Sequence, residues 1–240
     1  MKKTYFITVI FVLLASISAY STTWSEKEIQ DPISGETTKV YDIMSYGGYI
    51  YNWPSKYDAV FWPLTDTKFI RFNTKSGYIA FGSDFEEIND AEKKQVTEFL
   101  KQNYDPANPP VSHIDMLKWL FKVYEVRGAD NEFKIRHYCL MSYLTRKNTS
   151  ESSNYRKKAL SLMDKYLNSA KPSMYKAQLY IVAGFYSALL KIGNEEIYWD
   201  KLTNSEYGID DPEKLKSSKE YIDKILKEIK SGEYKENYFK

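Results

Sequence analysis

Apolar residues recur at helical spacing along most of the chain after residue 88. The first such stretch begins at Asn89 or Asp90, both of which are good N-cap residues. We therefore predict helices over the following stretches: Asn89 to Tyr104, Ser112 to Gly128, Asp130 to Arg146, Ser150 through Tyr166, Pro172 through Leu190, Glu195 to Leu202 and Asp211 through Ile229. The final ten residues, from Ser231, lack this pattern and are predicted to fray.

The stretch from Gln178 to Leu190 is apolar almost all the way round. Such a helix is normally covered on most sides by other helices. Gly184 lies near its middle, where a glycine costs about 1 kcal/mol relative to alanine. We interpret Gly184 as a point at which a neighbouring helix approaches closely.

Aromatic side chains crowd between Tyr41 and Phe81, a region that glycines and prolines divide into short pieces. This composition predicts short β-strands. Two of them, Phe69 to Phe72 and Tyr78 to Phe81, are predicted to form a hairpin closed by Asn73 to Gly77. The preceding stretch, Trp24 to Lys39, is polar and is predicted to be irregular.

The rings of this region permit two interpretations. They either build the core of a small unit, or they form an exposed platform for a glycan or a partner, with Tyr51, Trp53, Tyr57 and Trp62 as the candidate binding residues. Both interpretations give the same fold class. It is α+β and mainly α, with a small aromatic-rich β head followed by antiparallel helix pairs.

One motif resembles a known family. The run Ser76-Gly77-Tyr78-Ile79-Ala80-Phe81, followed by Asp84-Phe85-Glu86, is similar to an uncharacterised bacterial family. In that family a Cys-Pro-x-Cys-Gly-Tyr-x-Ala-Phe zinc-ribbon knuckle precedes tetratricopeptide-like helices. The resemblance covers Tyr49 to Leu202 and places the two knuckle cysteines at Asn73 and Ser76. Because neither residue is a cysteine, the resemblance implies a zinc ribbon that has lost its metal.

The N-terminus is typical of a secretory signal peptide over residues 1–21. Lys2 and Lys3 precede an apolar run from Tyr5 to Ala15, which small residues follow. Cleavage is predicted after Ser21, and a retained membrane anchor is the alternative. The apolar run is shorter than the about 20 residues that a membrane span requires. The mature protein is therefore predicted to be periplasmic or secreted, with no membrane span after cleavage.

The signal peptide and the resemblance together divide the chain into three parts. Residues 1–21 are the signal peptide, 22–88 a degenerate zinc-ribbon-like head, and 89–240 a helical tetratricopeptide-like domain. Two or three stacked helix pairs would form a curved repeat array. The spacing between the predicted pairs is irregular, so a plain helical bundle is the alternative.

Charge is balanced along the chain, with 34 basic and 32 acidic residues and a net charge of +2. Because no field of one sign results, nucleic acid is not a predicted partner. The single cysteine, Cys139, cannot form an internal disulfide bond. An exported chain without such a bond depends on its core for stability.

The sequence predicts no catalytic residue, no metal ligand and no cofactor. His137 lies on the apolar face of a predicted helix and is interpreted as a hydrogen-bonded core residue, whereas His113 begins a helix and is expected to be exposed. Cys139 is interpreted as a small buried hydrophobic residue. The familiar nucleophile, zinc-protease and phosphate-loop motifs are absent from the sequence.

These observations lead to one main hypothesis. The protein is exported and non-catalytic, and it works as a binding or scaffold protein through a helical repeat surface, with a protein of the cell envelope as partner and an unknown ligand. The alternative is a glycan-binding or glycan-hydrolysing envelope protein that uses the aromatic head and paired carboxylates, for which the candidates are Asp84, Glu86, Glu87, Glu195 and Glu196. A purely structural envelope component is a third hypothesis.

Overall fold

The computed structural model describes residues 23–240, so the predicted signal peptide at 1–21 lies outside the described residues. Helices dominate this part of the chain, accompanied by two small antiparallel sheets of two strands each. The predicted fold class, α+β and mainly α, is confirmed. Within residues 23–240, none of the helices combines the length and the apolar character that a membrane crossing needs.

The N-terminal hairpin is a feature that the sequence did not predict. Strand β1 (Thr23–Gln30) pairs antiparallel with β2 (Thr37–Ser45), so the prediction of an irregular segment from Trp24 to Lys39 was wrong. Each strand has a single buried residue, Ile29 in β1 and Val40 in β2. The apolar alternation that would reveal a half-buried strand is therefore too weak to read.

The aromatic region contains more 3₁₀ helix than strand. It contains η2 (Gly48–Asn52), η3 (Pro54–Asp58) and η4 (Thr67–Phe69), and η5 (Gly82–Phe85) follows it directly. Helices η2 and η3 stand where short strands were predicted between Tyr46 and Trp62. The predicted hairpin is confirmed as β3 (Ile70–Phe72) paired with β4 (Ile79–Phe81). The buried guanidinium of Arg71 joins the two sheets, because it contacts Asp42 of β2 at 2.5 Å and Glu86 at 2.6 Å.

The helices follow the predicted order closely. They are α2 (Asp90–Asn103), α3 (His113–Val126), α4 (Asn131–Leu144), α5 (Thr149–Ser169), α6 (Met174–Leu190), α7 (Glu195–Thr203), α8 (Pro212–Ser231) and α9 (Lys235–Tyr238). The side chains of Asn89, Ser112, Ser173 and Asp211 accept hydrogen bonds from first-turn backbone N–H groups, as N-cap residues do.

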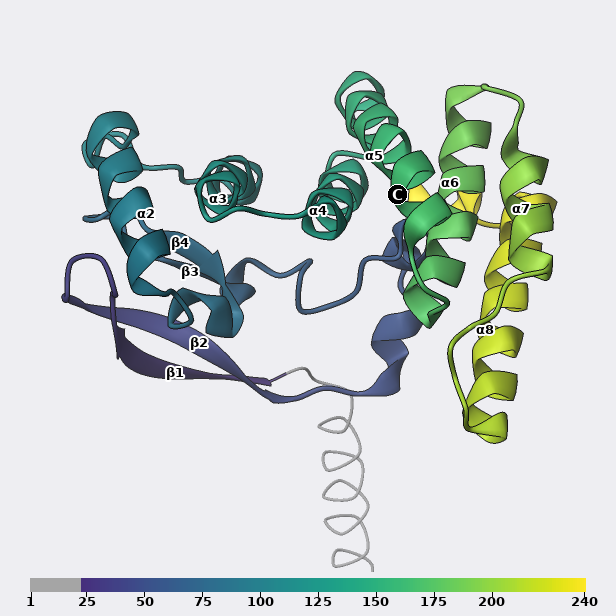
Figure 1. Cartoon of the computed structure of the whole chain (residues 1–240), viewed down its shortest axis with the longest axis horizontal. Coiled ribbons are helices and arrows are strands. Elements are labelled where there is room, and N and C mark those ends of the chain that lie inside the picture. The colour runs from purple at the N-terminus through teal and green to yellow at the C-terminus, as the bar shows by residue number, and fades with distance from the viewer. Residues whose placement is uncertain (1–22) are drawn as a thin grey trace, which may run out of the picture.

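Helices α2 to α7 lie beside one another in chain order and form a bent row, with α8 packed against α6 (Figure 1). The two sheets lie beneath one end of the row, where β4 packs against α3. Farther along, η3 contacts α4, α6 and α9. One apolar cluster continues from Ile29 in the hairpin to Tyr238 near the C-terminus, so the aromatic region and the helices share a core.

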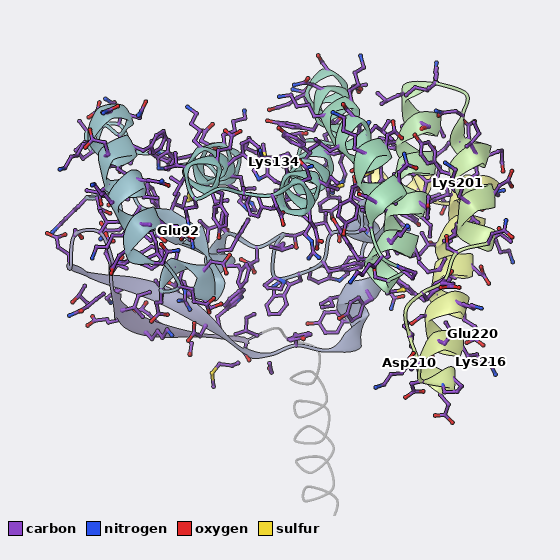
Figure 2. All side chains as sticks on the ribbon, viewed as in Figure 1. Glu92, Lys134, Lys201, Asp210, Lys216 and Glu220 are labelled. Carbon is purple, nitrogen blue, oxygen red and sulfur yellow. The ribbon has the colours of Figure 1, made fainter. Side chains whose placement is uncertain are left out.

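Charged side chains of both signs cover the outer surface of the helices. Lys201, Asp210, Lys216 and Glu220 are all exposed, and Figure 2 shows them on the outer side of α7, of α8 and of the loop that joins these helices. Charges of both signs on one face are typical of a solvated surface.

The close approach predicted at Gly184 is confirmed. A Cβ atom built on this residue of α6 would lie 2.1 Å from Nε1 of Trp199 in α7. No side chain fits at that distance, so the glycine allows the indole to approach the backbone of α6.

The C-terminal segment forms a short helix that reaches the core through one residue, where fraying was predicted. Helix α9 places Tyr238 in the core, fully buried, with its hydroxyl donating to Oδ1 of Asp58 at 3.0 Å. The prediction of frayed final residues was therefore wrong.

Candidate functional site

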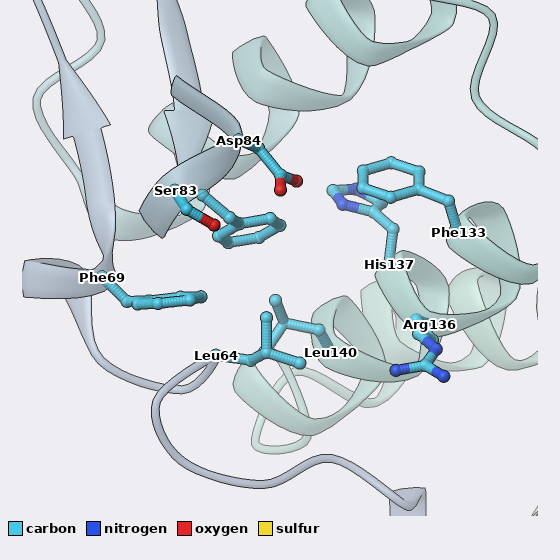
Figure 3. A pocket seen from close by; sticks show the side chains of 9 residues that line it. Leu64, Phe69, Ser83, Asp84, Phe133, Arg136, His137 and Leu140 are labelled. Atoms are coloured by element: carbon cyan, nitrogen blue, oxygen red, sulfur yellow. The ribbon is translucent and has the colours of Figure 1, made fainter. Parts of the chain in front are cut away.

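A pocket of about 200 Å³ lies between α4 and the segment that contains β4 and η5 (Figure 3). We call it the His137 pocket. Apolar side chains make most of its wall, and four polar side chains lie among them. Its lining residues are Leu64, Phe69, Phe81, Ser83, Asp84, Phe133, Arg136, His137 and Leu140.

Local structure explains why these side chains converge. Phe133, Arg136, His137 and Leu140 are spaced by three and four positions along α4, so they share one face of that helix. Opposite them, the chain turns sharply at Gly82, with φ +38°, to start η5. A Cβ there would lie 2.6 Å from the ring of Phe69, so a glycine is needed to bring Ser83 and Asp84 to the mouth of the pocket.

His137 is the most deeply buried of the four polar side chains in the wall. Its side chain is 4% exposed, and its ring lies 4.5 Å from that of Phe121 and 6.3 Å from that of Phe133. His137 was predicted to be a hydrogen-bonded core residue: it is buried, but its Nδ1 has no hydrogen-bond partner within the described residues. Burial, together with the nearby charge of Lys158, lowers the pKa of His137 to about 3. The imidazole is therefore neutral at physiological pH, with one donor and one acceptor nitrogen.

Asp84 faces the His137 ring across the pocket (Figure 3). Its Oδ2 accepts a hydrogen bond of 2.6 Å from the hydroxyl of Tyr124, and that hydroxyl in turn accepts the backbone N–H of Phe81 at 3.2 Å. The ring of Tyr124 also stacks on Phe133, with 4.3 Å between the centroids. These contacts fix the position of the Asp84 carboxylate relative to α3 and α4. It is therefore a fixed part of the pocket wall.

Arg136 borders the pocket from its exposed side. It pairs with Glu132 at 2.6 Å, and its guanidinium lies 4.2 Å from the centre of the Tyr175 ring. Both contacts hold the side chain on the surface of α4 and α6. The rim therefore offers one guanidinium and one hydroxyl, that of Ser83, to an incoming group.

The arrangement suits binding better than catalysis. Ser83, Asp84 and His137 are the residue types of a hydrolase triad, but within residues 23–240 no hydrogen bond joins any two of them. An imidazole with a pKa of about 3 is also too weak a base to activate a hydroxyl near neutral pH. What the pocket can do is accept an apolar group that carries a polar atom.

The four predicted binding residues do not share one surface. Tyr51 is 44% exposed and pairs with Phe61 at 5.2 Å, and Trp53 is half-buried. Tyr57 and Trp62 are both buried in the core, so the exposed platform of four rings is not formed. Ligand binding by Tyr51 and Trp53 stays a prediction.

A second hollow, of about 430 Å³, lies beside Trp53 and Tyr57. The C-terminal helices supply its acidic side, with the following lining residues: Glu228, Glu233 and Glu236. Nζ of Lys56 and the hydroxyl of Tyr57 each lie 2.7 Å from Oε2 of Glu228. Burial alone would raise the pKa of Glu228, but these two hydrogen bonds lower it, so the carboxylate stays ionised.

The other sequence candidates have different surroundings. Glu86 pairs with Arg71, and Glu196 pairs with Lys230 at 2.8 Å. Cys139 is buried, and burial raises the pKa of its thiol, as expected of a small core residue. His113 is half-buried, where exposure was expected.

The zinc site implied by the resemblance does not fit the residues present. Asn73 and Ser76 supply an amide and a hydroxyl, whereas structural zinc takes thiolates and imidazoles. Across residues 23–240, no group of three or more His, Cys, Asp or Glu side chains is placed to hold a metal ion.

No protein-family model matches the chain, and no curated protein or solved structure matches it either.

Proposed function

We propose that the protein is an exported, non-catalytic binding protein that takes one ring or branched apolar group of an envelope partner into the His137 pocket. The observation that carries the proposal is the pocket itself, an apolar hollow with a buried, neutral imidazole whose Nδ1 makes no hydrogen bond. Buried polar atoms without partners are uncommon in folded proteins, and this one lies in the wall of a pocket, where a bound group could supply the missing partner.

The size of the pocket limits what enters it. Sites for drug-sized ligands measure about 300–1,000 Å³, whereas this one measures about 200 Å³. It therefore suits a single side chain better than a cofactor. Interfaces between proteins are often centred on one such anchor, with weaker contacts around it. The exposed surfaces of α3 and α4 would supply those contacts.

The pocket predicts binding of p-cresol, which carries the ring and hydroxyl of a tyrosine side chain. A dissociation constant of about 0.1–1 mM is expected, because the ring leaves water and the hydroxyl can bond either to the imidazole or to Asp84. Titration by calorimetry, or by NMR shifts of the α4 amides, measures it.

A variant at the mouth provides the test of location. Ser83 is exposed at the rim, so Ser83→Trp should fold normally and weaken p-cresol binding at least tenfold. Ser217 is an equally exposed serine on α8, and Ser217→Trp should bind as the wild type does. Absence of saturable binding, or equal binding by both variants, would refute the pocket as the site. The same pair of variants, used as baits in envelope extracts, identifies proteins captured through the pocket.

A second candidate function is glycan binding at the hollow beside Trp53. The favouring observation is that two of the rings predicted for this role, Trp53 and Tyr57, line it together with the amides of Asn52 and Asn237. Hydrolysis is less well supported, because Glu228 is held ionised by Lys56 and Tyr57 and a general acid must carry a proton. Titration with N-acetylglucosamine oligomers, with tryptophan fluorescence as the signal, tests this second function: saturable binding supports a glycan site beside Trp53.

A further inference from the structure

The two hairpins of the head end in turns of the same construction. The first runs Asp31-Pro32-Ile33-Ser34-Gly35 and the second Asn73-Thr74-Lys75-Ser76-Gly77. In each, the N–H of the glycine donates to the carbonyl of the first residue at 2.8 Å, and the glycine has positive φ, +74° and +82° respectively. Two segments 42 positions apart, from 31 to 73, thus adopt one backbone turn.

The side chains of the two turns also make matching hydrogen bonds. Oδ1 of the first residue accepts the N–H two positions later, at 2.8 Å for Asp31 and 2.9 Å for Asn73. Oγ of the serine likewise accepts the N–H two positions later, at 3.3 Å for Ser34 and 3.1 Å for Ser76. Each turn therefore holds the side chains of its first and fourth residues by backbone donors.

The two turns face each other and are joined through Asp31. This carboxylate is fully buried, and its Oδ2 accepts hydrogen bonds from Ser34 of its own turn at 2.9 Å and from Ser76 of the other turn at 2.5 Å. An ion pair between Lys75 and Glu36, at 3.2 Å, adds a second link at the surface. The cluster satisfies its own hydrogen bonds, so nothing in it requires a metal ion.

In each turn, two residues other than the corner residues separate the first corner residue from the second. Four-cysteine zinc sites have the same spacing in two facing turns. We infer that Asp31, Ser34, Asn73 and Ser76 mark the four corners of a metal-ligand cage in which the buried carboxylate of Asp31 replaces the metal ion as the link between the hairpins. The sequence motif pointed to one of these turns, and the structure supplies the second. Chelators and thiol oxidants should therefore leave the stability of the head unchanged. Four cysteine thiolates at the corners should create a binding site for Zn²⁺.

The test is the full-length variant Asp31→Cys/Ser34→Cys/Asn73→Cys/Ser76→Cys, titrated with Co²⁺ under reducing conditions. It should bind one Co²⁺ per chain with the visible spectrum of tetrahedral thiolate coordination, and Zn²⁺ should displace the Co²⁺. The matched control has four cysteines at exposed positions in or directly after the two turns, Glu36→Cys/Thr37→Cys/Thr74→Cys/Lys75→Cys. It should bind at least 100-fold more weakly, and Cys139 is present in both proteins.

Each outcome decides the question. A corner variant that folds on addition of Zn²⁺ supports the cage, because metal binding then supplies folding free energy. One that stays unfolded with Zn²⁺, or that binds no better than the control, overturns it. In the wild type, EDTA should leave the unfolding temperature unchanged, and a fall would show that the native head holds a metal after all.

Discussion

Replacing Tyr238 by alanine is expected to lower the free energy of unfolding by about 4–6 kcal/mol, a large fraction of the stability of a typical domain. The ring is fully buried and lies 6.0 Å from Tyr57 and 5.3 Å from Phe185, which come from η3 and α6. Its removal leaves a cavity where three parts of the chain meet. The substitution also removes one of the two hydroxyl groups that donate to Oδ1 of Asp58; the other is that of Tyr186.

Urea unfolding followed by fluorescence measures this effect, and Tyr238→Phe separates its two causes. The phenylalanine keeps the packing and loses only the hydroxyl, so a loss of about 1–2 kcal/mol is expected. An alanine variant within 1 kcal/mol of the wild type would contradict the burial of Tyr238, because about 3–5 kcal/mol is the usual cost of truncating a buried ring.

The starts of the helices could be predicted from sequence because their causes are local. Asn89, Ser112, Ser173 and Asp211 each accept a hydrogen bond from an N–H two or three positions later. Gly184 was also informative, since a glycine in an apolar helix needs a packing reason. In these cases the residues that explain the structure are close together in the sequence or conspicuous by type.

The burial of Tyr238 could not be predicted in the same way. Its partner Asp58 lies 180 positions earlier, and the short segment around Tyr238 has no apolar periodicity of its own. The hairpin β1–β2 was missed for a similar reason. Contacts from Arg71 to Asp42 and Glu86 join it to the rest of the head, and such long-range ion pairs leave no local pattern.

The candidate site could be predicted only in part. The apolar face of α4 that carries His137 was predicted, but the pocket exists because the chain at Gly82 holds η5 opposite that face. Composition also could not separate rings in the core from rings on the surface, since Trp62 is buried and Tyr51 is exposed within the same aromatic region. A pocket depends on how two distant elements meet, which neither composition nor periodicity describes.

Two buried titratable groups should give opposite contributions to stability between pH 4 and 6. Burial raises the pKa of Asp58 from 3.8 to about 6, against the effect of hydrogen bonds from Tyr186 and Tyr238 and of the charge of Arg156. The folded chain therefore binds this proton more tightly, and stability falls as pH rises through this window. Burial lowers the pKa of His137 from 6.5 to about 3, so the unfolded chain binds that proton more tightly and stability rises with pH.

Between its folded-state and unfolded-state pKa values, each group changes the free energy of unfolding by at most about 1.4 kcal/mol per pH unit, so each contributes about 2–2.5 kcal/mol between pH 4 and 6. The two contributions nearly cancel in the wild type. In Asp58→Asn the opposing contribution of the carboxyl group is absent, so the free energy of unfolding should increase by about 2 kcal/mol from pH 4 to pH 6 relative to the wild-type curve. In His137→Phe, which places an apolar ring beside Phe121 and Phe133, it should decrease by a similar amount.

The double variant should regain the wild-type pH dependence, and this is the decisive control. Asp42 and Glu228, whose pKa values are lowered by their cationic partners, titrate in all four proteins. Their contributions to the free energy of unfolding therefore cancel in the differences between the curves. Urea unfolding at pH 4, 5 and 6 gives the four curves. If the Asp58→Asn curve runs parallel to that of the wild type, the buried carboxylate does not hold its proton in the folded chain. If the His137→Phe curve does so, the imidazole that lines the pocket is not kept neutral by burial, and the polar character proposed for the pocket must be revised.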